Sequence, residues 1–117
     1  MNISTKDWQV RVQIPEYSTK DELDILVNDT DADVRAEVAR HGHRVHLDIL
    51  VHDVDWRVRR RVALRGYQDH LDILVNDEDW YVRVAVARQG HPEHLVALLK
   101  DKDIHIRDEA LKQAGLS

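Results

Sequence analysis

The sequence contains no cysteine and no phenylalanine among its 117 residues, and it has only two prolines. Without thiols, the chain can form neither a disulfide nor a cysteine-ligated zinc or iron–sulfur site, and it has no cysteine nucleophile. Without phenylalanine, the core must be built mainly from Val, Leu, Ile and Ala. A chain of this length buries roughly two thirds of the surface that it exposes when unfolded, so one modest domain is expected.

Long apolar runs and an excess of positive charge are also lacking. No run approaches the roughly 20 apolar residues that a membrane-spanning helix needs, and the polar start MNISTKDWQ has no apolar signal-peptide segment. The net charge is −5 at pH 7, which disfavours binding to nucleic acid over the whole surface. We therefore expect a cytoplasmic protein that does not contact a membrane.

One hexapeptide, HLDILV, occurs twice, at residues 46–51 and 70–75. The two copies begin 24 residues apart. Dividing the chain at that spacing gives four consecutive repeats without insertions, at residues 22–45, 46–69, 70–93 and 94–117. A fixed period of this length is typical of stacked repeats, because one repeat cannot bury its apolar side alone. Residues 1–21 fit the period poorly, since Pro15 falls where a helix interior is expected. We predict that they form a degenerate N-terminal capping repeat.

Each repeat contains two helical patterns. Leu47, Leu50 and Val51 are spaced as one apolar stripe on a short helical segment, which we expect to be α-helical or partly 3₁₀ because little chain remains for it. Asp55 is a predicted N-cap for a longer helix over about 56–65, and Gly66 is its predicted end. The chain is therefore predicted to be all-α, a right-handed α-solenoid of four repeats. The predicted inward positions of the longer helices include Val58 and Val62. They also include one position that is a small residue in three successive repeats, Ala39, Ala63 and Ala87.

The period, the string D-x-D-x-x-V-R, the following A-R/L-x-G and the leucine-rich short segment together resemble the leucine-rich repeat variant and, more distantly, HEAT-type repeats. That resemblance implies alternating α- and 3₁₀-helices in a right-handed superhelix, and a binding rather than a catalytic role. It also implies a ladder of hydrogen bonds between stacked repeats, made by an Asp and an Arg six residues apart. The matching pairs are Asp29 and Arg35, Asp53 and Arg59, Asp77 and Arg83, and Asp101 and Arg107. The iron–sulfur cluster first described for that family required a cysteine-rich segment, so no cofactor is expected here.

The predicted outward positions of the longer helices differ between repeats, whereas the apolar columns do not. Such a ridge is either an ordinary solvated surface or a recognition face, in which arginine and aromatic side chains are the usual anchors. We predict a protein–protein interaction module whose partner-binding residues are Trp56, Arg57, Arg60, Arg61, Arg65, Trp80, Tyr81 and Arg88. The ridge itself comprises Asp33, Glu37 and Arg40; Arg57, Arg61 and Leu64; Tyr81, Ala85 and Arg88; and His105, Glu109 and Lys112.

The repeat 46–69 differs in charge from its neighbours. It carries five arginines against four carboxylates, whereas both adjacent repeats have more acidic than basic residues. Arginines on helix 56–65 could bind an acidic protein partner, contact phosphates of a nucleic acid, or simply pair with nearby carboxylates. Nucleic-acid binding is therefore the alternative function. The tryptophans at the start of the longer helices, Trp8, Trp56 and Trp80, either pack on a neighbouring repeat or act as exposed anchors.

Histidines supply a third hypothesis. His41, His43 and His46 form H-x-H-x-x-H and are the candidate zinc ligands, while His91 and His94 form H-x-x-H next to Glu93. The column His46, His70 and His94 is equally consistent with residues that start or pack the short helix. We expect no native metal site.

Catalytic signatures are not found in the sequence. There is no glycine-rich phosphate loop, no G-x-S-x-G and no H-E-x-x-H. Aspartates that recur in every repeat are explained by helix caps and the ladder. The chain is therefore not expected to be an enzyme.

Overall fold

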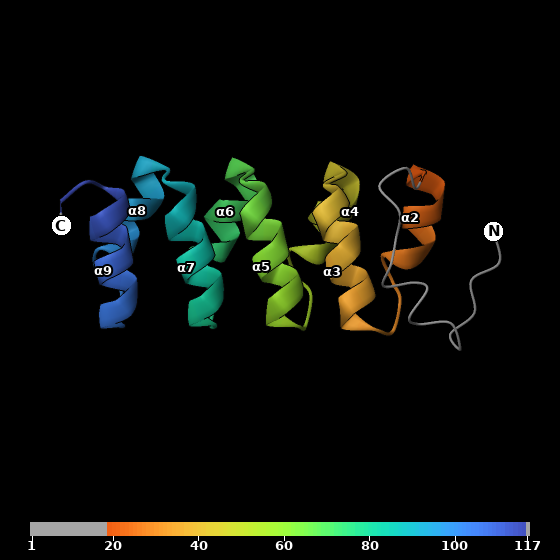
Figure 1. Ribbon diagram of the computed structural model, residues 1–117, viewed down its shortest axis with the longest axis horizontal. Coiled ribbons are helices and arrows are strands. Elements are labelled where there is room, and N and C mark those ends of the chain that lie inside the picture. The colour runs from red at the N-terminus through yellow and green to blue at the C-terminus, as the bar shows by residue number, and fades with distance from the viewer. Residues whose placement is uncertain (1–18, 117) are drawn as a thin grey trace. The chain divides into compact units, whose positions relative to one another are not determined.

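The computed structural model describes residues 19–116, and within them the chain is all-α, as predicted. Helices of seven and ten residues alternate along the chain (Figure 1). They are α2 (Lys20–Leu26), α3 (Ala32–His41), α4 (Arg44–Leu50), α5 (Trp56–Arg65), α6 (Gln68–Leu74), α7 (Trp80–Gln89), α8 (Pro92–Leu98) and α9 (Ile104–Gln113).

The predicted capping repeat, with Trp8 and Pro15, lies outside the described residues except for residues 19–21, where Thr19 caps α2. In the described part of the chain, every helix is too short or too polar to cross a bilayer.

The two aspartates of each D-x-D string form local hydrogen bonds in the connection that leads into a longer helix. The second aspartate is the N-cap, as predicted: its carboxylate accepts the backbone N–H two residues later at 2.8 Å. The first aspartate accepts the N–H of the second at 2.8–2.9 Å. Both hydrogen bonds close local turns, and they satisfy backbone N–H groups at the start of the helix. The capping residues are Asp31, Asp55, Asp79 and Asp103, and the preceding partners are Asp29, Asp53, Asp77 and Asp101.

The ends of the longer helices also follow the sequence. Gly66 has a φ of 78°, a left-handed conformation that glycine adopts without steric cost, and this ends α5. In the last repeat, Ala114 keeps right-handed backbone angles and Gly115, one residue later, has a φ of 75°. The shift by one residue therefore reflects the alanine, whose Cβ disfavours the left-handed region.

The short helices are α-helical over their whole assigned length, which is one of the two forms expected from the sequence, whereas the family resemblance implied 3₁₀-helices. The N–H of Leu47 bonds to the carbonyl of His43, and that of Val51 to the carbonyl of Leu47, both four residues back. Bonds of the 3₁₀ type occur only at the ends, as from the Asp53 N–H to the Leu50 carbonyl at 3.0 Å. The residues that remain in each repeat beside the longer helix are therefore enough for two α-helical turns.

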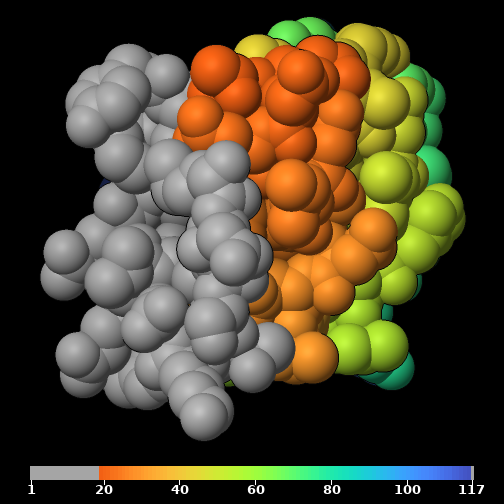
Figure 2. Space-filling view, turned by 90° about the vertical axis from the view of Figure 1, so that its right-hand side faces the viewer, coloured from red at the N-terminus to blue at the C-terminus, as the bar shows by residue number. Residues whose placement is uncertain are grey.

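The helices group into two compact units, one ending at Val62 and the other beginning at Ala63, within α5. In the first, α2 packs on α3 and α3 on α4, and the side chains of α2 and α3 form one continuous surface in Figure 2. In the second, α7 packs along α9, and α8 contacts both (Figure 1). The predicted inward side chains are fully buried, including Val58, Val62, Ala39, Ala63 and Ala87.

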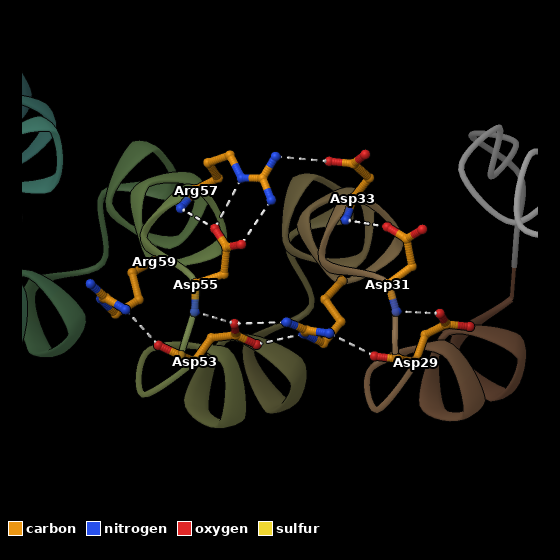
Figure 3. Close-up of polar contacts among 8 residues, drawn as sticks. Asp29, Asp31, Asp33, Asp53, Asp55, Arg57 and Arg59 are labelled. Atoms are coloured by element: carbon orange, nitrogen blue, oxygen red, sulfur yellow. Dashed lines mark hydrogen bonds and ion pairs between the residues drawn. The ribbon is translucent and has the colours of Figure 1, made fainter.

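Arginines in the longer helices join successive repeats within each compact unit. Arg35 donates through Nε and Nη2 to the Asp53 carboxylate, at 2.8 and 3.2 Å, and through Nη1 to the Asp29 carbonyl at 2.8 Å (Figure 3). Arg83 makes the same contacts to the Asp101 carboxylate and the Asp77 carbonyl. The aspartate six residues before each arginine therefore accepts through its backbone carbonyl. The carboxylate that pairs with the arginine belongs to an aspartate of the following repeat.

Candidate interaction site

The outer face of the longer helices is exposed at the first turn of each, where the sequence predicted it. Asp33, Arg57, Tyr81 and His105 are all exposed. Ala85 is a correction, because the predicted outward alanine is buried, with only 2% of its surface exposed. Its side chain is a single methyl group, too short to rise above the larger side chains around it. The other two predicted outward residues of α7, Tyr81 and Arg88, are exposed.

A shallow groove of about 320 Å³ lies on this face between α7 and α9. On α7 the lining residues Trp80, Val84 and Arg88 are each four residues apart and share one side of the helix. His105 and Glu109 of α9 complete the groove. Trp80 and Arg88 belong to the predicted partner-binding set, whereas Val84 was missed. The i, i+4, i+8 spacing from Trp80 is the signal that could have identified it.

The aromatic side of the groove is formed by Trp80. This residue is 40% exposed, and its indole stacks on the ring of Tyr81, with centroids 3.9 Å apart and an angle of 25° between the planes. The ring of His105 lies 6.5 Å from the indole. A large apolar surface is therefore held in one orientation yet left accessible to a partner.

The charged side of the groove is an ion pair. Arg88 donates through Nε to Glu109 Oε1 at 2.9 Å, and this bond is the main reason why the pKa of Glu109 is lowered. Glu109 is well covered, whereas Arg88 is largely exposed. Glu109 therefore orients the guanidinium at the edge of the groove, next to the indole surface.

The arginines of α5 occupy different environments. Arg57 pairs with the Asp55 carboxylate at 2.8 Å and lies 3.7 Å from Asp33 (Figure 3). The bond to Arg57 lowers the pKa of Asp55. Arg60 and Arg61 are half-buried, whereas Arg65 is exposed. The exposed arginine at the start of α5 is thus balanced by two carboxylates.

Trp56 occupies the same repeat position as Trp80 but is half-buried. Of these two predicted anchors, the structure makes Trp80 the more accessible.

The repeated histidines are buried packing residues, because His46, His70 and His94 are only 1–3% exposed. The ring nitrogen Nε2 of His46 lies 2.5 Å from the Asp24 carboxylate, and Nε2 of His94 lies 2.7 Å from Asp72. The column therefore links short helices of consecutive repeats, which is the packing role that the sequence allowed.

The three candidate zinc ligands are not brought together. Nδ1 of His41 is within 2.9 Å of the Glu37 carbonyl and so bonds to its own helix. Among residues 19–116, the groups whose ligand atoms converge include His91, Glu93 and His94, but not His41, His43 and His46.

The contact between His46 and Asp24 predicts an acid dependence of stability. The pKa of Asp24 lies below its usual 3.8, first because of the bond with His46 and then because of Lys20. A lowered folded-state pKa stabilises the fold above the unfolded value and loses this contribution as the pH falls through the folded value. Asp24→Asn should therefore flatten the loss of stability below about pH 4, followed by urea unfolding at stepped pH. Asp21→Asn, an exposed carboxylate on the same helix, is the control, and equal acid profiles for the two variants would contradict the assignment.

Comparison of the chain with protein-family models and with curated proteins gave no match. The functional argument therefore comes from the residues and their geometry.

Proposed function

We propose that this chain is a non-catalytic protein-interaction module that binds its partner in the groove between α7 and α9. The observation that carries the proposal is the accessible indole of Trp80, held against Tyr81 at the edge of a concave site that also contains Arg88. Tryptophan, tyrosine and arginine are the residues that most often dominate the binding energy of protein interfaces. An exposed aromatic pair beside an oriented guanidinium is therefore a reasonable anchor point.

The proposed architecture is a cytoplasmic right-handed α-solenoid of four repeats, similar to the leucine-rich repeat variant and to HEAT-type repeats. Three features support it: the unbroken 24-residue period, the alternation of short and longer helices, and the arginine bonds to the following repeat. In such a fold the framework columns are constant and the outer face is free to vary. The variation between repeats on the longer helices is what a recognition face requires.

The chemistry of the groove favours a partner segment with an apolar or aromatic side chain next to a carboxylate. Trp80 and Val84 provide apolar contact surface. Arg88 uses Nε for Glu109, and the fork-shaped guanidinium has further donors at its Nη atoms. A partner carboxylate can therefore bind Arg88 without displacing Glu109, which favours an acidic partner.

Trp80→Ala is expected to weaken binding of such a segment at least tenfold, because a central tryptophan anchor contributes about 2 kcal/mol or more. Peptides selected from a random library on the wild-type chain supply the probe, with affinity measured by fluorescence anisotropy. Trp56→Ala, at the same position one repeat earlier, is the matched control and should retain binding. Equal losses in the two variants would place the binding surface elsewhere.

Nucleic-acid binding through α5 is the competing function. The carboxylates of Asp55 and Asp33 next to Arg57 argue against it, because they reduce the charge available to phosphates. A salt-dependent mobility shift of duplex or single-stranded nucleic acid, lost on replacing Arg57, Arg60 and Arg61 by Ala, would favour this function over the protein-binding groove.

A further inference from the structure

The hydrogen bonding of His94 leaves one of its two ring nitrogens without a partner, as in the other two histidines of its column. Its Nε2 lies 2.7 Å from a carboxylate oxygen of Asp72. Because an ionised carboxylate only accepts hydrogen bonds, Nε2 must carry a proton. In the neutral ring, Nδ1 then bears the lone pair, and this atom is buried with no hydrogen-bond partner in the described structure. Burying an unsatisfied polar atom has an energetic cost, and an imidazole lone pair is a common metal ligand.

Two further ligand groups converge on this ring. His91 caps α8, and Glu93 and His94 are in its first turn. One nitrogen of each ring and one carboxylate oxygen of Glu93 all lie within 4.8 Å of one another. The two rings are stacked, with centroids 5.5 Å apart. Pro92, at the first helical position, has a fixed φ that favours this turn.

Glu93 is suited to be the anionic member of the group. A glutamate carboxylate is one of the usual zinc ligands and supplies negative charge to the ion. Gln68 Nε2 donates to Oε1 of Glu93, and a carboxylate has further lone-pair sites with which it can bind a cation. The side chain is exposed, so it can rotate toward the two rings.

We propose that His91, Glu93 and His94 bind a divalent transition-metal ion, with Zn²⁺ the best match, and that Asp72 orients His94 through its other nitrogen. Two imidazoles and one carboxylate suit zinc, with a fourth position left for water or a partner side chain. Donors about 2.1 Å from one ion in a tetrahedral site are roughly 3.4 Å apart, so ligand atoms that lie within 4.8 Å of one another need to approach by at most about 1.4 Å when the ion binds. A carboxylate behind a metal-binding histidine is a frequent arrangement that fixes the ring and raises its basicity.

The chain contains a natural comparison in the repeat 46–69. His43 and His46 occupy the positions of His91 and His94, and their ring centroids are also 5.5 Å apart. Nε2 of His46 faces Asp24, and its Nδ1 is likewise buried without a partner. The two pairs differ in the angle between their rings, 78° here and 28° for His91 and His94. They also differ at Val45, an exposed side chain where the other repeat has Glu93. Two neutral ligands without the carboxylate should hold zinc far more weakly.

Calorimetric titration of the tag-free full chain with zinc chloride tests the site. We expect one ion per chain with a dissociation constant of about 1–10 μM, and at least tenfold weaker binding in His91→Ala and Glu93→Val. His43→Ala should keep the wild-type affinity. Val45→Glu, which supplies the missing carboxylate, should raise the capacity to two ions per chain.

Nitrogen-15 NMR of the histidine rings separates this proposal from nonspecific binding to surface imidazoles. Without metal, His94 should have its proton on Nε2, and zinc should shift Nδ1. Three results would overturn the proposal: no saturable binding below about 100 μM zinc, unchanged affinity in both His91→Ala and Glu93→Val, or a proton on Nδ1 of His94. A Val45→Glu chain that still binds one ion would overturn the assignment of Glu93 as the deciding ligand.

Discussion

Arg83→Ala is expected to lower the free energy of unfolding by about 3–5 kcal/mol, because it breaks a buried ion pair on one side only. Arg83 is 5% exposed and donates to the carboxylate of Asp101 at 2.8 Å and to the carbonyl of Asp77 at 2.6 Å. Without the guanidinium, the well-covered Asp101 carboxylate loses its cation and the Asp77 carbonyl loses its side-chain donor. Urea unfolding monitored by circular dichroism measures the change.

Arg88→Ala is the matched control for this experiment. Arg88 also pairs with a carboxylate at 2.9 Å, but its side chain is 56% exposed, and exposed pairs contribute about 1 kcal/mol or less. The double variant Arg83→Ala, Asp101→Ala should be more stable than the two single losses added together, because it leaves no buried carboxylate unpaired. Equal effects of Arg83→Ala and Arg88→Ala would show that the ladder contributes little to stability.

The framework was predictable from the sequence because it depends on local chemistry repeated at a fixed spacing. An aspartate just before a helix can accept a hydrogen bond from one of the first backbone N–H groups of that helix, as Asp79 does. Val58 and Val62 are one helical turn apart and are both buried. These features require no knowledge of the neighbouring repeat, and the all-α fold follows from them.

The site was less predictable because it depends on how each helix is rotated about its axis. The predicted ridge on α7 was Tyr81, Ala85 and Arg88, of which Tyr81 and Arg88 are exposed and Ala85 is buried. The groove adds Trp80 and Val84, which line it together with residues of α9. Since several positions of α7 are apolar, no clear polar stripe marked the outward face. The groove could therefore be found only once α9 was in place beside α7.

The converging histidines were hidden for a similar reason. In the sequence, H-x-H-x-x-H at His41, His43 and His46 is the denser pattern and looks the better metal site. In the described structure, the ligand atoms of His41, His43 and His46 do not converge. The sparser His91, Glu93 and His94 lie in one helical turn and do converge. Ring orientation, which sequence spacing does not specify, makes the difference.

Leu71→Ala is expected to lower the free energy of unfolding by about 2–5 kcal/mol, because it leaves a cavity in a core that has little room to collapse. Leu71 is completely buried on α6. Ile73, two residues later in the repeated hexapeptide, is 46% exposed, so Ile73→Ala should cost less than about 1 kcal/mol. The two variants remove similar apolar groups from one short helix, and urea unfolding compares them directly.

The His and both Leu residues of HLDILV are buried in residues 70–75. A large loss of stability in Leu71→Ala with a small loss in Ile73→Ala would therefore mean that the hexapeptide recurs because these three residues are structural. The opposite order would contradict this assignment of the repeated residues. The exposed isoleucine also recurs, at Ile25, Ile49 and Ile73, although burial does not require it. Because Ile73→Ala should leave the fold nearly intact, the same variant can be used to ask whether that apolar column contributes to binding of the selected peptides.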